Sequence, residues 1–221
     1  MRLTQTIRVV DKILGANDAV AAENRALFDR VKVFALDILG SPGSGKTSLV
    51  CRTAREAGLR MAVIEGDIAT ARDAEKVAET GVPVVQINTG GACHLDASMV
   101  KTALEGLDLT ALDLLVIENV GNLVCPAEFE LGEHAKMVVS STTEGLDKPA
   151  KYPLAFQKSK CVVLNKIDLA QPTDFNLAEY RKEVAQVKGD LAVVEVSCRT
   201  GEGLEGWYEW LRRAVADLRG S

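Results

Sequence analysis

The sequence has 221 residues, a length that suits one α/β domain or at most two small ones. Hydrophobic residues make up 47% and charged residues 26%, which excludes a disordered or fibrous chain. The net charge of -5 argues against nucleic acid or an anionic membrane as the main partner. No run approaches the roughly 18 apolar residues of a membrane span, and the N-terminal segment lacks the apolar core of a signal peptide, so we expect a cytoplasmic protein without a membrane partner.

Helices and strands are predicted to alternate along the chain. Apolar residues recur at helical spacing over 9–30, with a break expected near 15–18, where G-A-N-D includes a candidate N-cap. Short apolar runs predict seven strands, at 31–40, 61–67, 82–88, 112–119, 135–141, 161–166 and 191–197. Polar segments between them predict helices at 47–57, 69–79, 97–105, 176–188 and 203–218. This alternation predicts a doubly wound, mostly parallel α/β sheet with helices on both faces and a ligand site at the carboxyl ends of the strands.

A phosphate-binding loop follows the first strong strand. The segment GSPGSGKT matches G-x-x-x-x-G-K-S/T in the strand-turn-helix setting that this motif requires. We expect Lys46 to reach the β and γ phosphates and to stabilise the transferred phosphoryl group, and Thr47 to offer its hydroxyl to Mg²⁺. The predicted phosphate contacts are Gly40, Ser41, Pro42, Gly43, Ser44, Gly45, Lys46, Thr47 and Ser48.

Two carboxylates are expected at the ends of neighbouring strands, close to the phosphate loop. Asp67 ends one predicted strand and Glu118 ends another, and either is a candidate to hold Mg²⁺ or to orient the attacking water. The segment E-N-V-G resembles the D-x-x-G switch of GTPases, so the amide of Gly121 is expected near the γ phosphate. Alternatively, Asp67 caps a helix that opens near Thr70, and Glu118 is a solvated strand end.

A second motif predicts which base is bound. N-K-I-D follows the strand at 161–166, and Asp168 is expected to accept two hydrogen bonds from guanine, which adenine cannot supply in full. Asn165 would brace the loop, and the stem of Lys166 would lie along the ring. The segment S-C-R-T-G-E-G begins at Ser197 and resembles the loop whose amide, here near Cys198, meets the guanine carbonyl.

Cysteine and histidine side chains provide a third constellation. Cys93 and His94 follow one strand directly, and Cys125 lies seven residues beyond the carboxylate of the E-N-V-G segment. Thiolate and imidazole suit Zn²⁺ or Ni²⁺, whereas Mg²⁺ prefers oxygen ligands. Three ligands cannot close a tetrahedral structural site, which favours an open site or one shared across a dimer. We expect loss of the γ phosphate to move the 121–125 segment and to withdraw Cys125 from the metal.

The sequence has three further features: the remaining cysteine thiols, a turn-rich segment and one lysine within it. Cys51, Cys161 and Cys198 are expected to be packing thiols. The segment 142–153 is turn-rich, and we expect a mobile loop near the nucleotide or a partner chain. Within it, Lys148 is a candidate to pair with phosphate or with an acidic residue across a dimer, and the alternative is a solvated lysine.

In this order the phosphate loop, ENVGNLVCP, GGACHLD and NKID resemble the nickel-insertion GTPases of NiFe hydrogenase maturation, the HypB family of SIMIBI-class P-loop GTPases. The resemblance covers nearly the whole chain. The sequence has no internal repeat, low-complexity tract or domain-splitting linker, so we expect a single GTPase domain over 1–221, with a helical lead-in at 1–30 and the G domain at 31–221. The resemblance also implies GTP hydrolysis with Mg²⁺, a GTP-dependent homodimer, and Ni²⁺ or Zn²⁺ at Cys93, His94 and Cys125. Its implied partners are a small zinc-containing nickel chaperone and the hydrogenase large-subunit precursor.

Three alternatives stay open at the level of the sequence. A related metallochaperone GTPase for urease or another metalloenzyme is the nearest, although the urease type is expected to carry Cys-Pro-His where Cys93 is here followed directly by His94. A regulatory GTP switch with purely structural cysteines is the second. A P-loop kinase of small molecules is the third, and the N-K-I-D motif disfavours it.

Overall fold

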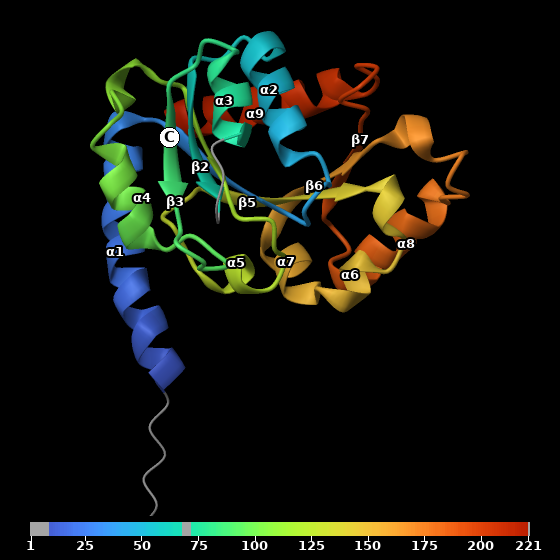
Figure 1. Ribbon diagram of the computed structural model, residues 1–221, viewed down its shortest axis with the longest axis horizontal. Coiled ribbons are helices and arrows are strands. Elements are labelled where there is room, and N and C mark those ends of the chain that lie inside the picture. The colour runs from blue at the N-terminus through green and yellow to red at the C-terminus, as the bar shows by residue number, and fades with distance from the viewer. Residues whose placement is uncertain (1–8, 68–71, 221) are drawn as a thin grey trace, which may run out of the picture.

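A parallel sheet forms the centre of the computed structural model, which describes residues 9–67 and 72–220 (Figure 1). Its seven strands are β1 (Phe34–Gly40), β2 (Met61–Asp67), β3 (Val84–Asn88), β4 (Leu114–Glu118), β5 (Ala135–Ser141), β6 (Ser159–Asn165) and β7 (Ala192–Glu195). They lie in the order β3-β2-β4-β1-β5-β6-β7, and every pairing is parallel. The predicted doubly wound α/β fold is confirmed, and the sheet is parallel throughout the described residues.

Helices cover both faces of the sheet (Figure 1). On one face, α2 (Lys46–Glu56), α3 (Arg72–Ala78) and α9 (Leu204–Gly220) pack over β1, β2 and β4 through a core that includes Leu49 and Trp207. The opposite face is covered by α1 (Val9–Val31), α4 (Ala97–Leu104), α5 (Cys125–Glu128), α6 (Lys148–Lys151), α7 (Pro153–Lys158) and α8 (Leu177–Val187). Burial of both faces explains why the strand sequences are nearly continuous apolar runs.

The first helix differs from its prediction. We expected a break near 15–18, but α1 runs unbroken from Val9 to Val31. Gly15 has open space around it, and Asn17 makes tertiary contacts instead of capping a helix: its amide donates to Glu130 O at 2.8 Å and accepts from Ala97 N at 2.9 Å. The N-terminal part of the lead-in lies outside the described residues, as does the start of the helix predicted at 69–79, including Thr70.

The segment 142–153 is largely helical where we expected a loop, and its mobility stays a prediction. It contains a 3-10 turn at 142–144 and the helix α6, and α7 begins at Pro153. Each of α5, α6 and α7 has four to six residues and a proline in its first two positions, so each helix is too short for a helical period to be recognised in the sequence.

Among residues 9–67 and 72–220, no helix has the length and apolar character needed to cross a bilayer. The single domain over 1–221 stays a prediction.

Candidate functional site

The phosphate loop connects the end of β1 to the start of α2. A Cβ atom on Gly40 would lie 2.7 Å from Val139 O, so only glycine fits between the strands at this point. Gly45 has φ of +98°, and a Cβ there would collide with the side-chain amide of Asn165. Lys46 is 8% exposed, and its ammonium lies 3.2 Å from Gly40 O, inside the loop. The loop therefore has the compact form and the inward-facing lysine that are typical of a phosphate-binding loop.

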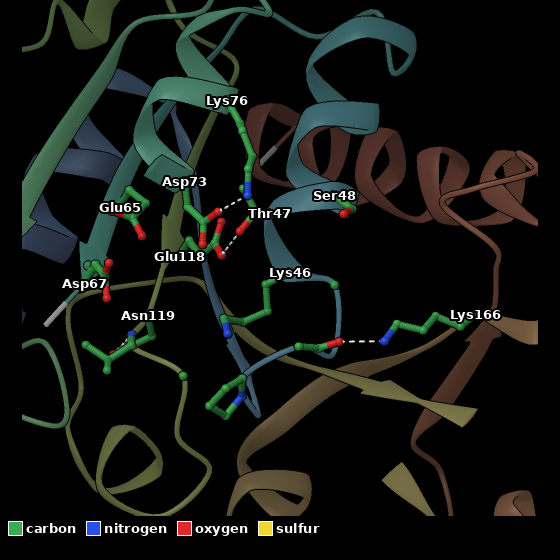
Figure 2. A pocket seen from close by; sticks show the side chains of 16 residues that line it. Lys46, Thr47, Ser48, Glu65, Asp67, Asp73, Lys76, Glu118, Asn119 and Lys166 are labelled. Carbon is green, nitrogen blue, oxygen red and sulfur yellow. Dashed lines mark hydrogen bonds and ion pairs between the residues drawn. The ribbon is translucent and has the colours of Figure 1, made fainter. Parts of the chain in front are cut away.

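A pocket of about 440 Å³ opens beside this loop (Figure 2). Of the residues predicted from the sequence to bind nucleotide or magnesium, those that line it are Pro42, Gly43, Gly45, Lys46, Thr47, Ser48, Asp67, Glu118, Gly121 and Lys166. The hydroxyl of Thr47 donates to Glu118 Oε1 at 2.7 Å, as the dashed line in Figure 2 shows. The structure thus brings the hydroxyl and both proposed carboxylates into one cavity.

Glu65 also lines this pocket, and sequence reasoning missed it. It lies beside Glu118 in the register of β2 and β4 and is 3% exposed. Glu65 stands two residues before Asp67 on the same strand, so the two share a face, and this period-2 spacing was the available signal. Glu65 Oε2 and Glu118 Oε2 are buried and have no hydrogen-bond partner among the described residues.

Burial shapes the charges in the pocket. It raises the pKa of Glu118 to about 7, with the Lys46 ammonium acting in the opposite direction, and it raises the pKa of Glu65 to about 8, assisted by the charge of Glu118. Burial also lowers the pKa of Lys46. Carboxylates that are costly to ionise, with unpartnered oxygens beside a threonine hydroxyl, fit an oxygen-ligated divalent cation such as Mg²⁺.

An ion pair at the start of α3 faces the same cavity. Asp73 and Lys76 line the pocket, and Lys76 Nζ lies 2.6 Å from Asp73 Oδ1 (Figure 2). The sequence analysis did not select either residue, because a charged pair three residues apart is an ordinary feature of a solvated helix face.

The proposed base-reading residues meet beside the phosphate loop. Asn165 donates to Ser44 O at 3.1 Å, and its Oδ1 accepts from the backbone amides of Lys166 at 2.8 Å and Cys198 at 3.1 Å. The hydroxyl of Ser197 donates to Asp168 Oδ1 at 2.6 Å. The two loops expected to hold guanine are therefore tied together by Asn165 and by the carboxylate.

A hydrogen bond and an adjoining hollow connect this region to the phosphate loop. Lys166 Nζ donates to Gly43 O at 2.7 Å, and the backbone of Lys166 is left-handed, with φ of 62°. A hollow of about 280 Å³ adjoins the main pocket and is lined by Thr47, Ser48 and Cys198. The remaining predicted phosphate contacts, Gly40, Ser41 and Ser44, belong to the same loop.

Cysteine and histidine side chains gather at a second place. Cys93 Sγ lies 3.0 Å from Cys125 Sγ and 3.8 Å from His94 Nδ1, and all three ligand atoms lie within 4.8 Å of one another. We call this group the Cys/His cluster. A metal-thiolate bond of about 2.3 Å allows two bound sulfurs to be up to about 4.6 Å apart, so the donor set fits Zn²⁺ or Ni²⁺. The thiol-thiol hydrogen bond raises the pKa of Cys125, and burial lowers the pKa of His94.

The segment that carries Cys125 also contacts the phosphate loop. Asn122 forms an isolated antiparallel bridge with Gly40, and its side-chain amide donates to Cys93 O at 3.2 Å. A Cβ on Gly121 would lie 3.0 Å from Pro42 Cγ. The segment 120–125 therefore connects the nucleotide pocket with the Cys/His cluster.

The other cysteines lie apart from this cluster. Cys161 is fully buried in β6, Cys51 contacts Lys76 O through its thiol at 3.6 Å, and Cys198 is half-buried. Lys148 is half-buried rather than free in solvent: its ammonium lies 3.3 Å from Ser41 Oγ and 3.6 Å from Glu144 Oε1. It thus faces the phosphate loop of its own chain.

The sheet topology, the phosphate loop and the carboxylate-lined pocket define a P-loop nucleotide-binding protein. Residues 34–195 match the model of the family described as CobW/HypB/UreG, nucleotide-binding domain. Over 212 residues the chain is 50% identical to the hydrogenase maturation factor HypB of Azotobacter vinelandii, a match that covers 95% of this chain and 70% of that protein. The chain belongs to the HypB family of hydrogenase maturation factors.

Two solved structures have a similar fold. The crystal structure of HypB from Helicobacter pylori in complex with nickel superimposes with a TM-score of 0.88 at 34% identity, covering 91% of this chain and 96% of that one. The crystal structure of the hydrogenase maturation factor HypB from Archaeoglobus fulgidus gives a TM-score of 0.85 at 35% identity, covering 91% of this chain and all of the other. The family resemblance predicted from the four motifs is confirmed.

Proposed function

We propose that this protein hydrolyses GTP with Mg²⁺, binds Ni²⁺ at the Cys/His cluster, and uses the nucleotide state to control delivery of nickel during NiFe hydrogenase maturation. The single observation that carries the proposal is the segment 120–125, which contacts Gly40 of the phosphate loop and ends in a thiol of the cluster. The HypB protein of Helicobacter pylori was crystallised with nickel, which supports Ni²⁺ as the cargo. Zn²⁺ fits the same donor set and is the competing ion.

Hydrolysis in this proposal depends on positioning and charge. Lys46 and the amides of the phosphate loop stabilise the charge that spreads over the transferred phosphoryl oxygens. Thr47, Asp67 and Glu118 are the residues that would hold Mg²⁺, which supplies neutralisation of phosphate charge when bound. Glu65 supports the same group of oxygens from the adjacent strand. Asp168 reads guanine, with Ser197 orienting the carboxylate.

The metal and the nucleotide are coupled through a shared backbone. With the γ phosphate present, the amide of Gly121 contacts it and holds the 121–125 segment against the phosphate loop. Loss of that phosphate frees the segment, Cys125 moves away from Cys93, and the affinity for nickel falls.

The partners follow from the family and from the shortage of ligands. Because the Cys/His cluster has three donors per chain, a GTP-dependent homodimer would place two clusters together and complete the coordination. The hydrogenase large-subunit precursor is the proposed recipient of nickel, and a small zinc-containing nickel chaperone is the proposed partner protein in the transfer. A cytoplasmic location stays a prediction from the sequence.

Two measurements on the purified protein test this proposal. Competition between nucleotides should favour GTP over ATP, and Ni²⁺ should be retained by wild type and lost by Cys93→Ala. Cys51→Ala, which removes a thiol outside the cluster, is the matched control and should retain nickel. Equal nickel retention by wild type and Cys93→Ala would leave a GTP switch with structural cysteines, and a preference for ATP would favour a small-molecule kinase.

A further inference from the structure

A group of buried polar side chains lies on the face of the sheet that α1 and α4 cover, and hydrogen bonds connect it to segments next to the Cys/His cluster. We call it the polar hub, and its members are Asp37, Asn119, Glu133 and Lys136. Each is at most 4% exposed, and Lys136 Nζ lies 2.9 Å from Asp37 Oδ2 and 2.7 Å from Glu133 Oε1. Buried ions of this kind are weak contributors to stability, since apolar residues of similar volume often replace them without loss. Their position relative to the metal ligands suggests a different role.

Asn119 connects the two segments that carry the metal ligands. Its Oδ1 accepts hydrogen bonds from Leu95 N at 3.1 Å and from Val120 N at 3.0 Å, and its Nδ2 donates to Asp37 Oδ1 at 3.1 Å. Leu95 follows the Cys93-His94 pair directly, and Val120 begins the segment that ends at Cys125. One buried side-chain amide therefore connects the backbone that follows Cys93 and His94 to the backbone that leads to Cys125.

Lys136 connects the polar hub to Phe129, whose ring contacts the metal-ligand candidate His94. Its ammonium donates to Phe129 O at 2.8 Å, and the ring of Phe129 stacks on the ring of His94, with centroids 3.9 Å apart and an interplanar angle of 26°. The imidazole of His94 therefore packs on Phe129, and the backbone of Phe129 is hydrogen-bonded to Lys136 of the polar hub.

Asn119 also adjoins the nucleotide pocket. It follows Glu118, which accepts a hydrogen bond from Thr47, and its own backbone amide donates to Ile38 O at 3.1 Å near the end of β1. Asn119 therefore links the end of β4, at the nucleotide pocket, to the backbone of Leu95 and Val120 through single hydrogen bonds.

We propose that Asn119 is a positioning residue for nickel: it preorganises the two backbone segments of the Cys/His cluster and passes the nucleotide state to both of them at once. This inference depends on the proposed function, because it assumes that the cluster binds Ni²⁺. Residues that orient metal ligands without touching the metal typically contribute 10–100-fold to metal affinity.

The test compares Ni²⁺ titrations of wild type, Asn119→Ala and Asn24→Ala in the presence of a non-hydrolysable GTP analogue. Asn24 is a matched control because it is also buried, at 2% exposure, and donates to Ala97 O and Leu131 O on the same side of the sheet. We expect Asn119→Ala to weaken nickel binding about tenfold or more and to change the thiolate-to-nickel charge-transfer absorption, while Asn24→Ala keeps the wild-type values. Wild-type affinity and absorption in Asn119→Ala would overturn the inference.

Failure of the proposed function gives a different result. In that case wild type itself binds nickel no better than Cys93→Ala, whatever residue occupies position 119. The inference alone fails when wild type binds nickel through Cys93 and Asn119→Ala does so equally well.

A measurement on wild type covers the case in which Asn119→Ala does not fold. If the hydrogen bonds from Leu95 and Val120 organise the metal site, then Ni²⁺ must stabilise them in return and slow the hydrogen exchange of these two amides. The amide of Tyr180 in α8, which bonds Asn176 O within its own helix, is the internal reference. Unchanged exchange of Leu95 and Val120 on adding nickel would contradict the proposed positioning.

Discussion

The hydroxyl of Ser197 donates to one carboxylate oxygen of Asp168 at 2.6 Å, and we propose that this carboxylate selects the base. A guanine offers two donors to this carboxylate, the ring N–H and the exocyclic amine, whereas an asparagine presents one donor and one acceptor. In this proposal, the residue at position 168 decides between guanine and a base that carries a carbonyl in place of the amine.

Asp168→Asn is expected to weaken GTP binding about a hundredfold or more and to improve binding of xanthosine triphosphate, because the new amide donates to the xanthine carbonyl. Competition against a fluorescent nucleotide measures both affinities. The control is Asp174→Asn, an aspartate on the surface beyond the motif, which should bind GTP as wild type does. GTP affinity that survives Asp168→Asn would show that the base is read elsewhere.

At the residue scale the sequence predicted the motif residues but not all of their neighbours. The residues selected from motifs fall into three groups: those that line the main pocket, the Cys/His cluster, and the proposed base-reading residues beside the phosphate loop. Each motif fixes backbone geometry as well as chemistry. Glu65 was missed because it stands inside an apolar strand, where a single glutamate carries no motif. The polar hub was missed because Asp37, Asn119 and Lys136 come from three different strand regions, and only the sheet order brings them together.

At the scale of elements the phosphate loop demands glycine for two separate reasons. Gly45 is left-handed, with φ of +98°, and it packs against the side-chain amide of Asn165. Gly15, in contrast, lies in the regular helix α1 with nothing within 4 Å of its Cβ position. The same substitution therefore has opposite consequences at the two sites.

Gly45→Ala should lower GTP affinity at least tenfold, since the loop must distort to relieve both the backbone strain and the clash with Asn165. Gly15→Ala should raise the free energy of unfolding by about 0.5–1 kcal/mol and leave GTP binding unchanged, because alanine favours the helix. Isothermal titration and urea unfolding measure the two quantities. Normal GTP binding by Gly45→Ala would contradict the close approach described here.

The boundaries of helices and strands could be predicted where an apolar run or a helical pattern extends over enough residues. The seven strands and the helices after β1, β3, β6 and β7 agree with their predicted ranges within a few residues. The break expected in α1 was wrong. The polar pair at 17–18 looks like an N-cap in the sequence, but the side chain of Asn17 instead forms hydrogen bonds with the backbone of Ala97 in α4 and of Glu130. The helix α7 packs against β5 and β6, and α5 and α6 pack against neighbouring helices, contacts that no local pattern encodes.

At the scale of the whole molecule, Asp113 joins distant parts of the fold. It accepts hydrogen bonds from the backbone and side chain of Arg60, just before β2, and its Oδ1 lies 2.6 Å from Arg219 Nη2 in α9. The hydrogen bonds from Arg60 are the main cause that lowers the pKa of Asp113 to about 2. Since the folded pKa is below the unfolded value, the stabilisation is complete above about pH 4 and is lost as the pH falls toward 2.

Asp113→Asn should therefore lower the free energy of unfolding by about 1–2 kcal/mol at pH 7, a value reduced for the exposure of Arg60, and the difference should shrink at pH 3. Urea unfolding at the two pH values measures it. The control is Asp190→Asn, an exposed aspartate before β7, which should follow wild type at both pH values. A constant difference between Asp113→Asn and wild type across this range would mean that the ion pairs do not act through the carboxylate charge.

The nucleotide pocket and the Cys/His cluster share the backbone between Asn119 and Cys125. The most direct measurement is the dissociation constant for Ni²⁺ with GDP and with a non-hydrolysable GTP analogue, determined on the same preparation. We expect nickel to bind at least about fivefold more tightly with the analogue than with GDP. Equal dissociation constants in the two nucleotide states would contradict the proposed coupling.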